Sequence, residues 1–444
     1  MFFGCRIACE FSVEMQSAQR ARNIRRSGWL ASAGRGLIGL ALLVCLLQTG
    51  RATVASWVAR RESAEALQSA ERWDPSNPDY PEQLGRALAA EGADAAPAQV
   101  ARAFEDSAGL APHRAANWTE VAEALDFSGD ASGAARAYGR ALKLFPKSPA
   151  INWQFANFEI RAGDAAAALE PLQTAIAGDA SLRTGAFDLA WRAGIPPEEI
   201  LEMLPARQEI LSAYLDFLVA TGRLDAAAGA WRRLIAPPER FDLDAAFRYF
   251  DAELRARDVD ALTRIWSDLG RHDPDRVHTH PDDGNRITNG GFEDAIVNGG
   301  FDWRIVPTDG AQIGTDASAA HDGARSLAVH FDGTLNLDFG SVAECVAVEA
   351  NTAYRLSAYT RSEEITTDTG PRIAVYDAFD HAALWIETGN VTGTTSWQEQ
   401  RLDFRTGPKT RLLIVQLVRR PSGKFDNKIA GTVWLDDVSL RAAR

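Results

Sequence analysis

The residues with the clearest capacity for chemistry lie together in HDPDRVHTHPDDGNR, residues 272 to 286. Imidazole and carboxylate groups such as these are suitable ligands for a transition metal. The candidate ligands are His272, Asp273, His278, His280, Asp282 and Asp283. The same residue types collect in polar, Pro-containing linkers, and that is the interpretation we favour. We therefore expect a linker over residues 272–286 and keep a metal site as the alternative.

No catalytic pattern stands out elsewhere. The sequence contains no G-x-S-x-G elbow, no H-E-x-x-H pair and no Walker loop. Its four cysteines, Cys5, Cys9, Cys45 and Cys345, give neither a zinc spacing nor a disulfide framework. Cys345 lies among apolar residues in VAECVAV, which indicates a buried side chain and not a nucleophile. The regions described below take up nearly the whole chain, so we expect a protein that is not an enzyme.

Composition divides the chain into a helical part and a β part. With 444 residues the chain is long enough for two or three domains. Residues from about 60 to 270 are rich in Ala, Leu, Arg and Glu, which favour helices. From about residue 286 onward, short alternating runs of Val, Ile, Thr and Tyr between glycines are typical of strands and turns. The net charge of -13 argues against nucleic-acid binding, which needs a basic surface.

The N-terminal region predicts a membrane anchor. Residues 36 to 50, GLIGLALLVCLLQTG, carry no charge and follow the cluster Arg20, Arg22, Arg25 and Arg26. We expect a cytoplasmic tail over residues 1–27 and a transmembrane signal anchor over residues 28–50, because positive charge holds the preceding segment in the cytoplasm. The apolar run is shorter than the about 20 residues of a spanning helix, so a cleaved secretory signal is the alternative. Met15 is an alternative start to Met1.

The helical part, residues 57–271, has the period of a repeat array. Large and small residues recur at the offsets of the tetratricopeptide pattern, which repeats about every 34 residues. The best unit contains Trp118, Val121, Ala122, Leu125, Ala134, Tyr138, Ala141 and Pro146. We expect about five or six helical hairpins, since repeats of this kind are stable only when stacked. The array resembles tetratricopeptide proteins, and that resemblance implies a protein partner on its concave face.

The β part, residues 287–444, alternates in the manner of strands. The expected strands are Ala324–Phe331, Val342–Glu349, Ala353–Arg361, Arg372–Ala378, Ala383–Thr388, Trp397–Arg405, Arg411–Arg420 and Thr432–Leu440. Turn sequences such as HDG, FDG and TGP separate them, without helical stretches between. Short strands in this arrangement predict an all-β jelly-roll sandwich. The predicted fold class is thus a membrane segment, an all-α hairpin array and an all-β sandwich.

An ordered set of motifs in the β part resembles carbohydrate-binding modules of the family 4 and 9 type. The set comprises NGGFE from Asn289, HDGARSL from His321, ANTAYRLSAYTR from Ala350, TSWQEQRLDF from Thr395 and the closing VWLDDVSL. By this resemblance, Glu293 and Asp436 would hold a structural calcium ion, whose preferred ligands are oxygens. The resemblance further implies glycan contacts through Trp303, Tyr376 and Trp385, with Asp377 binding hydroxyl groups. The alternative for both acids is that they cap turns or strand ends.

These features predict a non-catalytic, membrane-anchored scaffold. We expect a single-pass protein of the bacterial inner membrane with a cytoplasmic N-terminus and the bulk of the chain in the periplasm. The repeats would bind a protein partner and the sandwich a polysaccharide, because proteins that combine these parts resemble envelope components of exopolysaccharide assembly or export. The alternative is a pure protein–protein adaptor whose sandwich binds no sugar.

Overall fold

The computed structural model of the chain describes residues 37–91, 96–279 and 284–443. Residues up to Leu182 form one compact unit, and residues from Arg183 onward form a second. The predicted cytoplasmic tail (residues 1–27), residues 28–36 of the predicted anchor, both candidate start residues, and His280, Asp282 and Asp283 of the linker lie outside the described residues.

The first unit begins with the helix Leu37–Ala59, which is 23 residues long and has a mean hydropathy of 1.8 over its most apolar window. It is long and apolar enough to cross a membrane. Its apolar side chains from Leu37 to Leu47 are exposed, whereas Ala55 and Ala59 are buried in the core of the first unit. The helix therefore continues past the predicted span, and its last turns pack on the helical array.

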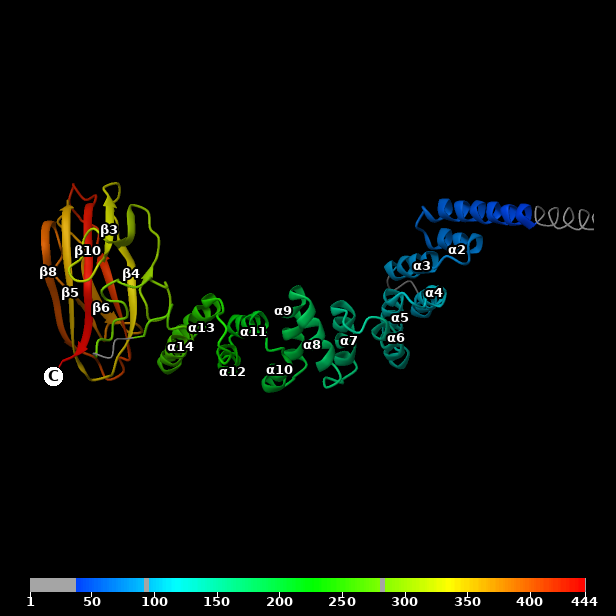
Figure 1. Cartoon of the computed structure of the whole chain (residues 1–444), viewed down its shortest axis with the longest axis horizontal. Coiled ribbons are helices and arrows are strands. Elements are labelled where there is room, and N and C mark those ends of the chain that lie inside the picture. Colours follow the sequence, from blue (N-terminus) through cyan, green and yellow to red (C-terminus); the bar gives the residue numbers. More distant parts are fainter. Residues whose placement is uncertain (1–36, 92–95, 280–283, 444) are drawn as a thin grey trace, which may run out of the picture. The chain divides into compact units, whose positions relative to one another are not determined.

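The helical array follows as short helices joined by tight turns (Figure 1). In the first unit they are α2 (Ala64–Trp73), α3 (Asp79–Ala90), α4 (Pro97–Leu110), α5 (Ala115–Ser128), α6 (Ala131–Leu144), α7 (Pro149–Arg161) and α8 (Leu169–Gly178). In the second unit they are α9 (Arg183–Arg192), α10 (Pro197–Met203), α11 (Gln208–Ala220), α12 (Leu224–Ile235), α13 (Leu243–Ala256) and α14 (Val259–His272). Between the two sets, η2 (Ala180–Leu182) is a single 3-10 turn.

The turns between these helices explain the repeat. Gly129 follows the last residue of α5 as its C-cap, with a φ of 88° that only glycine adopts readily. Asp130 is the N-cap of α6, and its carboxylate accepts the Gly133 N–H at 2.8 Å. The same Gly-Asp pair recurs as Gly163 (φ 87°) and Asp164 after α7. A glycine with positive φ followed by an aspartate that accepts a backbone N–H three residues later thus recurs 34 residues apart, at the predicted period.

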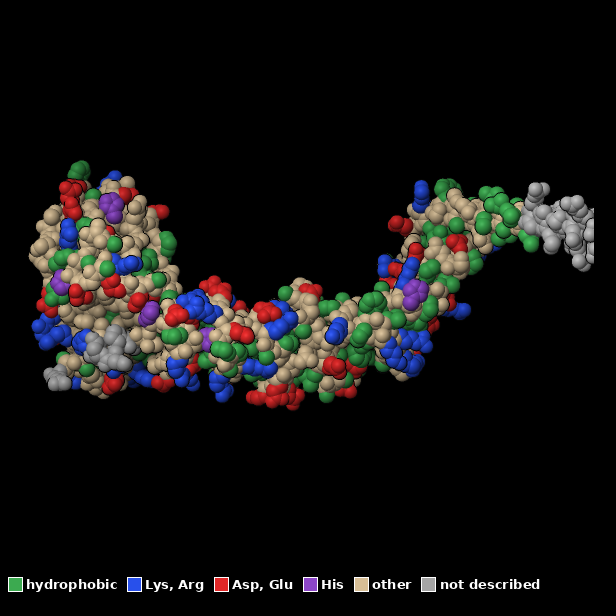
Figure 2. Space-filling view, viewed as in Figure 1, with side chains coloured by type: hydrophobic (Ala, Val, Ile, Leu, Met, Phe, Trp, Pro, Cys, Tyr) green, Lys and Arg blue, Asp and Glu red, His purple; other side chains and the backbone are tan. Residues whose placement is uncertain are grey.

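Polar contacts between neighbouring hairpins keep that period. In the first unit, Arg86 pairs with Glu120, Arg114 with Asp79 and Arg161 with Asp126. In the second unit, Arg248 pairs with Asp216 and Arg240 with Asp275. Each pair joins residues 32 to 35 positions apart. Figure 2 accordingly shows acidic and basic side chains interspersed along the helices.

The β part of the second unit contains two antiparallel five-stranded sheets within the described residues. The first sheet has the order β1-β4-β9-β6-β7, and the second has the order β2-β3-β10-β5-β8. The strands are β1 (Arg304–Ile305), β2 (Ala311–Asp316), β3 (Ser326–Asp332), β4 (Phe339–Ala347), β5 (Ala353–Ile365), β6 (Arg372–Asp377), β7 (Trp385–Glu387), β8 (Gly393–Arg405), β9 (Leu412–Arg419) and β10 (Ala430–Ala442). The chain passes repeatedly from one sheet to the other, as in a jelly roll.

The predicted sandwich is confirmed by this pairing. Alternate residues of β3, β4, β5, β6, β9 and β10 meet between the sheets in one apolar core. The segment that enters the sandwich lies beside β10, its last strand. The N–H of Arg286 donates to the carbonyl of Leu440, and the N–H of Val438 donates to the carbonyl of Gly290, both at 2.9 Å. Strands β1 and β2 were not expected from the sequence, because β1 has two residues and β2, AQIGTD, is half polar.

The two Asn-Gly-Gly-Phe turns serve different neighbours. Both asparagines have positive φ, 50° at Asn289 and 59° at Asn298, and both use the side-chain oxygen to accept a later backbone N–H. Phe292 of the first turn packs 5.1 Å from Trp303 inside the sandwich. Phe301 of the second turn packs edge-on against Phe250 of α13 and Trp266 of α14, at 5.0 and 6.2 Å.

Two ion pairs flank this aromatic joint. Arg304 of β1 bonds Asp251 of α13 at 2.7 Å, and Arg411 bonds Asp260 of α14 at 2.7 Å. The last helical pair and the first sheet are therefore packed together, and Val277 of the linker is buried.

Candidate functional site

The outer face of the first sheet carries two rows of side chains that run across four strands. Strand pairing places Cys345, Ile414, Tyr376 and Trp385 in one row and Ala343, Gln416, Ala374 and Glu387 in the next. These positions alternate along the strands with core residues such as Val375, Val415 and Leu417. Their side chains therefore point away from the core, on the outer face of the sheet. Ala343 and Ala374, on either side of Gln416, have small side chains and leave space on this face of the sheet. The larger side chains of Tyr376 and Trp385 stand next to that space.

Tyr376 and Trp385 form a stacked aromatic pair. Their ring centroids are 4.4 Å apart and their planes differ by 14°. Cross-strand pairing of β6 with β7 brings them opposite each other, where aromatic pairs stabilise a sheet. His381 packs edge-on against both rings, at 4.8 and 5.1 Å. Trp385 remains 39% exposed, which leaves aromatic surface available to a ligand.

Polar groups beside the pair are held in fixed positions. The Tyr376 hydroxyl donates to Gln416 Oε1 at 2.8 Å, and Gln416 Nε2 donates to the Gly340 carbonyl at 2.6 Å. Trp385 Nε1 donates to Glu387 Oε1 at 2.8 Å. Glu387 is also ion-paired with Arg420 and, at 3.4 Å, with Arg372. Burial alone would raise the pKa of Glu387, but the hydrogen bonds from Trp385 and Arg420 and the charges of both arginines hold that pKa below its ordinary value.

Trp385, Gln416 and Arg420 border an open cleft of about 870 Å³. Its lining residues are Asp338, Phe339, Gly340, Trp385, Gln416, Val418, Arg420 and Pro421. Arg419, which precedes Arg420, is completely buried and donates to the carbonyls of Thr369 and Asn427, so it ties together the loops at this end of the sheet. An aromatic surface beside fixed amide, carboxylate and guanidinium groups suits a ligand with apolar faces and many hydroxyl groups.

Two of the predicted glycan contacts are wrong. Trp303 is completely buried in the core of the sandwich, so no ring face is left for a sugar. Asp377 is also buried, and its Oδ1 accepts the N–H groups of Phe379 and Asp380 at 2.8 and 2.9 Å, which makes it a turn cap. Tyr376 and Trp385 are brought together as described, and their contact with a glycan stays a prediction.

The sequence reasoning missed Gln416, Glu387, Arg420 and His381. Gln416 carried the clearest signal, because it is the one polar residue inside the apolar run LLIVQLV of β9. A polar side chain at a position that faces away from the core marks a site or an open surface. Glu387 and Arg420 had no such mark, since charged residues at strand ends are common.

The two acids predicted to bind calcium lie on either side of the loop 321–325. Glu293 Oε1 accepts the N–H groups of Ala324 and Arg325, at 2.7 and 3.1 Å. Asp436 Oδ2 accepts the His321 N–H at 2.7 Å, and its Oδ1 accepts the Asp437 N–H at 2.8 Å. Burial raises the pKa of Asp436.

In this arrangement Glu293 Oε1 and both oxygens of Asp436 accept backbone N–H groups, as the turn-capping alternative predicts. Within the described residues, no group of three or more His, Cys, Asp or Glu side chains is placed so that it could hold a metal ion. Of the linker candidates, His272 contacts the carbonyls of Ile235 and Glu239 and so belongs to the helical array. Calcium binding stays a prediction that needs a direct test.

The sequence matches no protein-family model and no curated protein sequence. Solved structures similar to part of the chain include a family 61 carbohydrate-binding module in complex with β-1,4-galactotriose, with 17% identity and a TM-score of 0.26 over 36% of this chain and 99% of that one. A family 16 carbohydrate-binding module has 22% identity and a TM-score of 0.25 over 35% and 99%. The xylan-binding domain of a family 22 module has 15% identity and a TM-score of 0.26 over 37% and 97%. The fold described above rests on its own strand pairing and not on these similarities.

Proposed function

We propose that the protein is a non-catalytic adaptor of the bacterial envelope whose β-sandwich binds a polysaccharide in the cleft beside Trp385. The observation that carries this proposal is the stacked Tyr376–Trp385 pair next to the fixed polar groups of Gln416, Glu387 and Arg420. Sugar rings present apolar C–H faces and a rim of hydroxyl groups, so they complement an aromatic surface bordered by hydrogen-bonding groups. Because the cleft is open, it can bind internal sugar units of a polysaccharide as well as its end.

The environment of Glu387, the carboxylate bonded to Trp385 and Arg420 beside the cleft, supports a binding role over a hydrolytic one. A glycosidase needs a carboxylic acid whose pKa is raised so that it can protonate the leaving group. The pKa of Glu387 is instead lowered, and two arginines occupy its oxygens. Glu387 is therefore suited to holding Trp385 and Arg420 in position.

The helix Leu37–Ala59 supports the membrane-anchor part of the proposal, by its length and composition. We place the N-terminus in the cytoplasm because of the four arginines between positions 20 and 26, and the remainder of the chain in the periplasm. In this topology the sandwich, residues 287–444, would meet an exopolysaccharide during its assembly or export, and the repeats would bind a protein partner.

A polysaccharide-binding experiment on the full chain in detergent micelles tests the glycan part. The protein is applied to an array of bacterial polysaccharides, and the affinity for the best ligand is then measured by calorimetry for the wild type, Trp385→Ala and the control Trp73→Ala. Trp73 is a similarly exposed tryptophan of α2. We expect Trp385→Ala to weaken binding at least about tenfold, as for an aromatic residue that dominates a binding site, and Trp73→Ala to leave it unchanged.

Calcium is tested in the same experiment. Binding is measured with added calcium and with a chelator, and the thermal midpoint is recorded under both conditions. A calcium-dependent shift that disappears in Glu293→Gln would support the predicted ion. If no polysaccharide binds under either condition, or if Trp385→Ala binds as the wild type does, the glycan part is wrong and the protein is better described as a protein–protein adaptor.

A further inference from the structure

We infer that a groove across helices α3, α4 and α5 of the first unit binds a peptide segment that carries a lysine or arginine next to an aromatic or large aliphatic residue. This inference rests on the proposed adaptor function and names the chemistry of the partner that the repeats would recognise. It depends on three features of the groove: its helical stripes, its exposed aromatic residue and its unbalanced charge.

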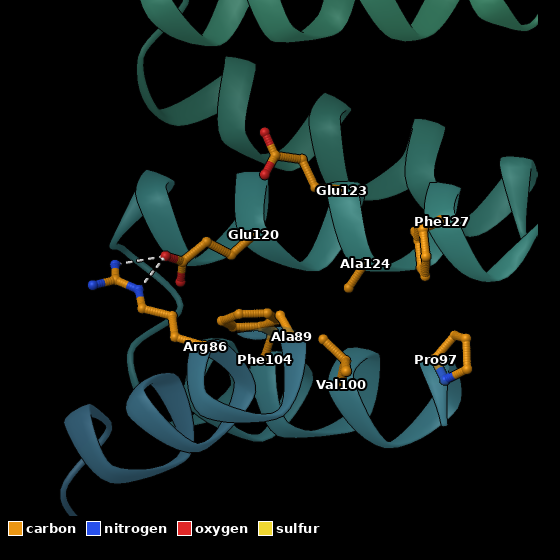
Figure 3. A pocket seen from close by; sticks show the side chains of 9 residues that line it. All are labelled: Arg86, Ala89, Pro97, Val100, Phe104, Glu120, Glu123, Ala124 and Phe127. Atoms are coloured by element: carbon orange, nitrogen blue, oxygen red, sulfur yellow. Dashed lines mark hydrogen bonds and ion pairs between the residues drawn. The ribbon is translucent and has the colours of Figure 1, made fainter. Parts of the chain in front are cut away.

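The groove is built from side chains at helical spacing (Figure 3). On α5, Glu120, Glu123, Ala124 and Phe127 occupy positions i, i+3, i+4 and i+7, so they form one stripe along the helix. The opposite wall comes from α4, where Pro97, Val100 and Phe104 have the spacing i, i+3 and i+7. Arg86 and Ala89 of α3 close one end of the groove. The resulting cavity is about 480 Å³, large enough for an aromatic side chain.

Phe127 offers an exposed aromatic surface on which a partner side chain can pack. Its side chain is 79% exposed, although it lies beside the buried Val100 and Ala124. Phe127 also lines a second hollow of about 410 Å³, together with Tyr138, Trp153 and residues of α7. A large exposed aromatic residue between two hollows is unusual on a solvated helix and typical of the centre of a binding surface.

The charge of the groove is unbalanced. Glu82 and Glu120 share one arginine, Arg86, with contacts of 2.7 and 2.6 Å. Asp126 has its own partner, Arg161, at 2.6 Å. Glu123 accepts a hydrogen bond from the Gln154 amide at 2.7 Å and is in no ion pair among the described residues. Of the charged residues that line the groove, Glu120 and Glu123 are acidic and Arg86 is basic, which leaves a formal charge of -1.

Glu120 has a further capacity to bind a cation. Its Oε1 faces Arg86, while its Oε2 is buried without a hydrogen-bond partner. Burial raises the pKa of Glu120, because the charged form loses solvation there. A partner ammonium or guanidinium group would restore that solvation and satisfy the free oxygen, and a partner carboxylate would be repelled.

Together these features select the ligand chemistry. The apolar walls require an aromatic or large aliphatic side chain, and Glu120 and Glu123 on the adjoining turn of α5 require a basic group next to it. One peptide segment supplies both at the spacing of neighbouring residues. The groove offers the ligand acceptors and apolar walls, so an acidic peptide is disfavoured.

Short fluorescein-labelled peptides test this inference on the full chain in detergent micelles. One pool carries Lys beside Phe or Trp with the other positions randomised, and the matched pool carries Glu in place of Lys. Fluorescence anisotropy gives the affinity of each pool. We expect the basic pool to bind at least about tenfold more tightly than the acidic pool, with a difference that shrinks as salt is added.

Two substitutions locate the binding, and two others serve as controls. Phe127→Ala should weaken binding of the basic pool at least about tenfold, and Glu123→Lys should abolish or reverse the preference for the basic pool. The controls are Phe145→Ala, which removes an exposed phenylalanine at the end of α6, and Glu105→Gln, which neutralises an exposed carboxylate of α4 outside the groove. Circular dichroism checks folding, which Phe127→Ala should preserve because the side chain is exposed.

The inference is wrong if the basic pool binds no more tightly than the acidic pool, or if Phe127→Ala and Glu123→Lys bind like the controls. Crosslinking of the membrane-embedded protein separates this failure from failure of the proposed function. A partner crosslinked to other helices of the array would leave the adaptor function in place and refute this groove. If no partner crosslinks to the array and no peptide binds, the protein-binding part of the proposed function fails as well.

Discussion

Phe301→Ala is the substitution that most directly tests how the sandwich is attached to the last helical pair. The Phe301 side chain is 1% exposed and contacts the rings of Phe250 and Trp266, at 5.0 and 6.2 Å. Removing a buried phenylalanine side chain costs about 3–5 kcal/mol. About 0.5–1.5 kcal/mol of that loss comes from the edge-on geometry of each aromatic pair, and the remainder from lost burial and the cavity that is left.

Hydrogen exchange measures this loss where it occurs. Because about 1.4 kcal/mol corresponds to a tenfold change in an equilibrium constant, a loss of about 3 kcal/mol should speed exchange of the α14 amides and of residues 297–305 about a hundredfold or more. Phe425→Ala is the control, since Phe425 is fully exposed in the same unit. If Phe301→Ala leaves exchange in α13 and α14 at the wild-type rate, the aromatic joint does not hold the hairpin to the sandwich and our reasoning about it is refuted.

Two further predictions concern ionisable groups near the same joint. Burial raises the pKa of Asp302 from its ordinary 3.8 to about 6. The protonated carboxyl therefore stabilises the fold fully below about pH 4, and this stabilisation is lost as the pH rises through 6. The free energy of unfolding should fall by about 3 kcal/mol in total over this range. Thermal unfolding from pH 4 to pH 7 should therefore show Asp302→Asn gaining stability relative to the wild type as the pH rises, and parallel profiles would contradict this. Burial also raises the pKa of the Cys345 thiol to about 11, so iodoacetamide at pH 8 should leave Cys345 unmodified in the folded protein and alkylate it after denaturation, as peptide mass spectrometry would detect. Alkylation in the folded protein at the rate of a free thiol would contradict the burial of Cys345.

Most of the fold could be predicted from the sequence because its signals are local and repeated. The Gly-Asp turns at Gly129 and Gly163, the small alanines and the large aromatic residues recur at a fixed distance, and each repeat reinforces the next. The main strands of the sandwich alternate between core and surface residues over long stretches, so their existence and type were clear. Strand β2 failed this test because an edge strand with polar residues and a glycine lacks the alternation.

The site could be predicted only in part, because exposure depends on long-range packing. Trp303 and Trp385 are both aromatic residues next to short β segments, yet one is enclosed by Phe292 and the core, while the other stands on the outer face. Nothing within a few residues of either tryptophan distinguishes them. The neighbouring rows that carry Trp385 and Gln416 bring β9 beside β6 and β7, which lie far from it in the sequence, and pairing of that kind has no local signature.

The role of the second Asn-Gly-Gly-Phe turn was likewise out of reach. The sequence indicates a turn, and the structure has one at Asn298. In the structure this turn positions Phe301 against Phe250 of α13 and Trp266 of α14. A phenylalanine that docks on another element looks the same in sequence as one that fills its own domain.

The meeting of the two ends of the sandwich at β10 has a practical consequence. The chain enters beside Leu440 and finishes along the same strand of the second sheet, whereas the cleft lies on the outer face of the first sheet. A label, a surface tether or a reporter domain joined after Ala442 would therefore emerge on the side of the sandwich away from the cleft. Immobilisation through that end should leave the cleft beside Trp385 open to long polymers, which makes it a suitable point of attachment for surface-based measurements.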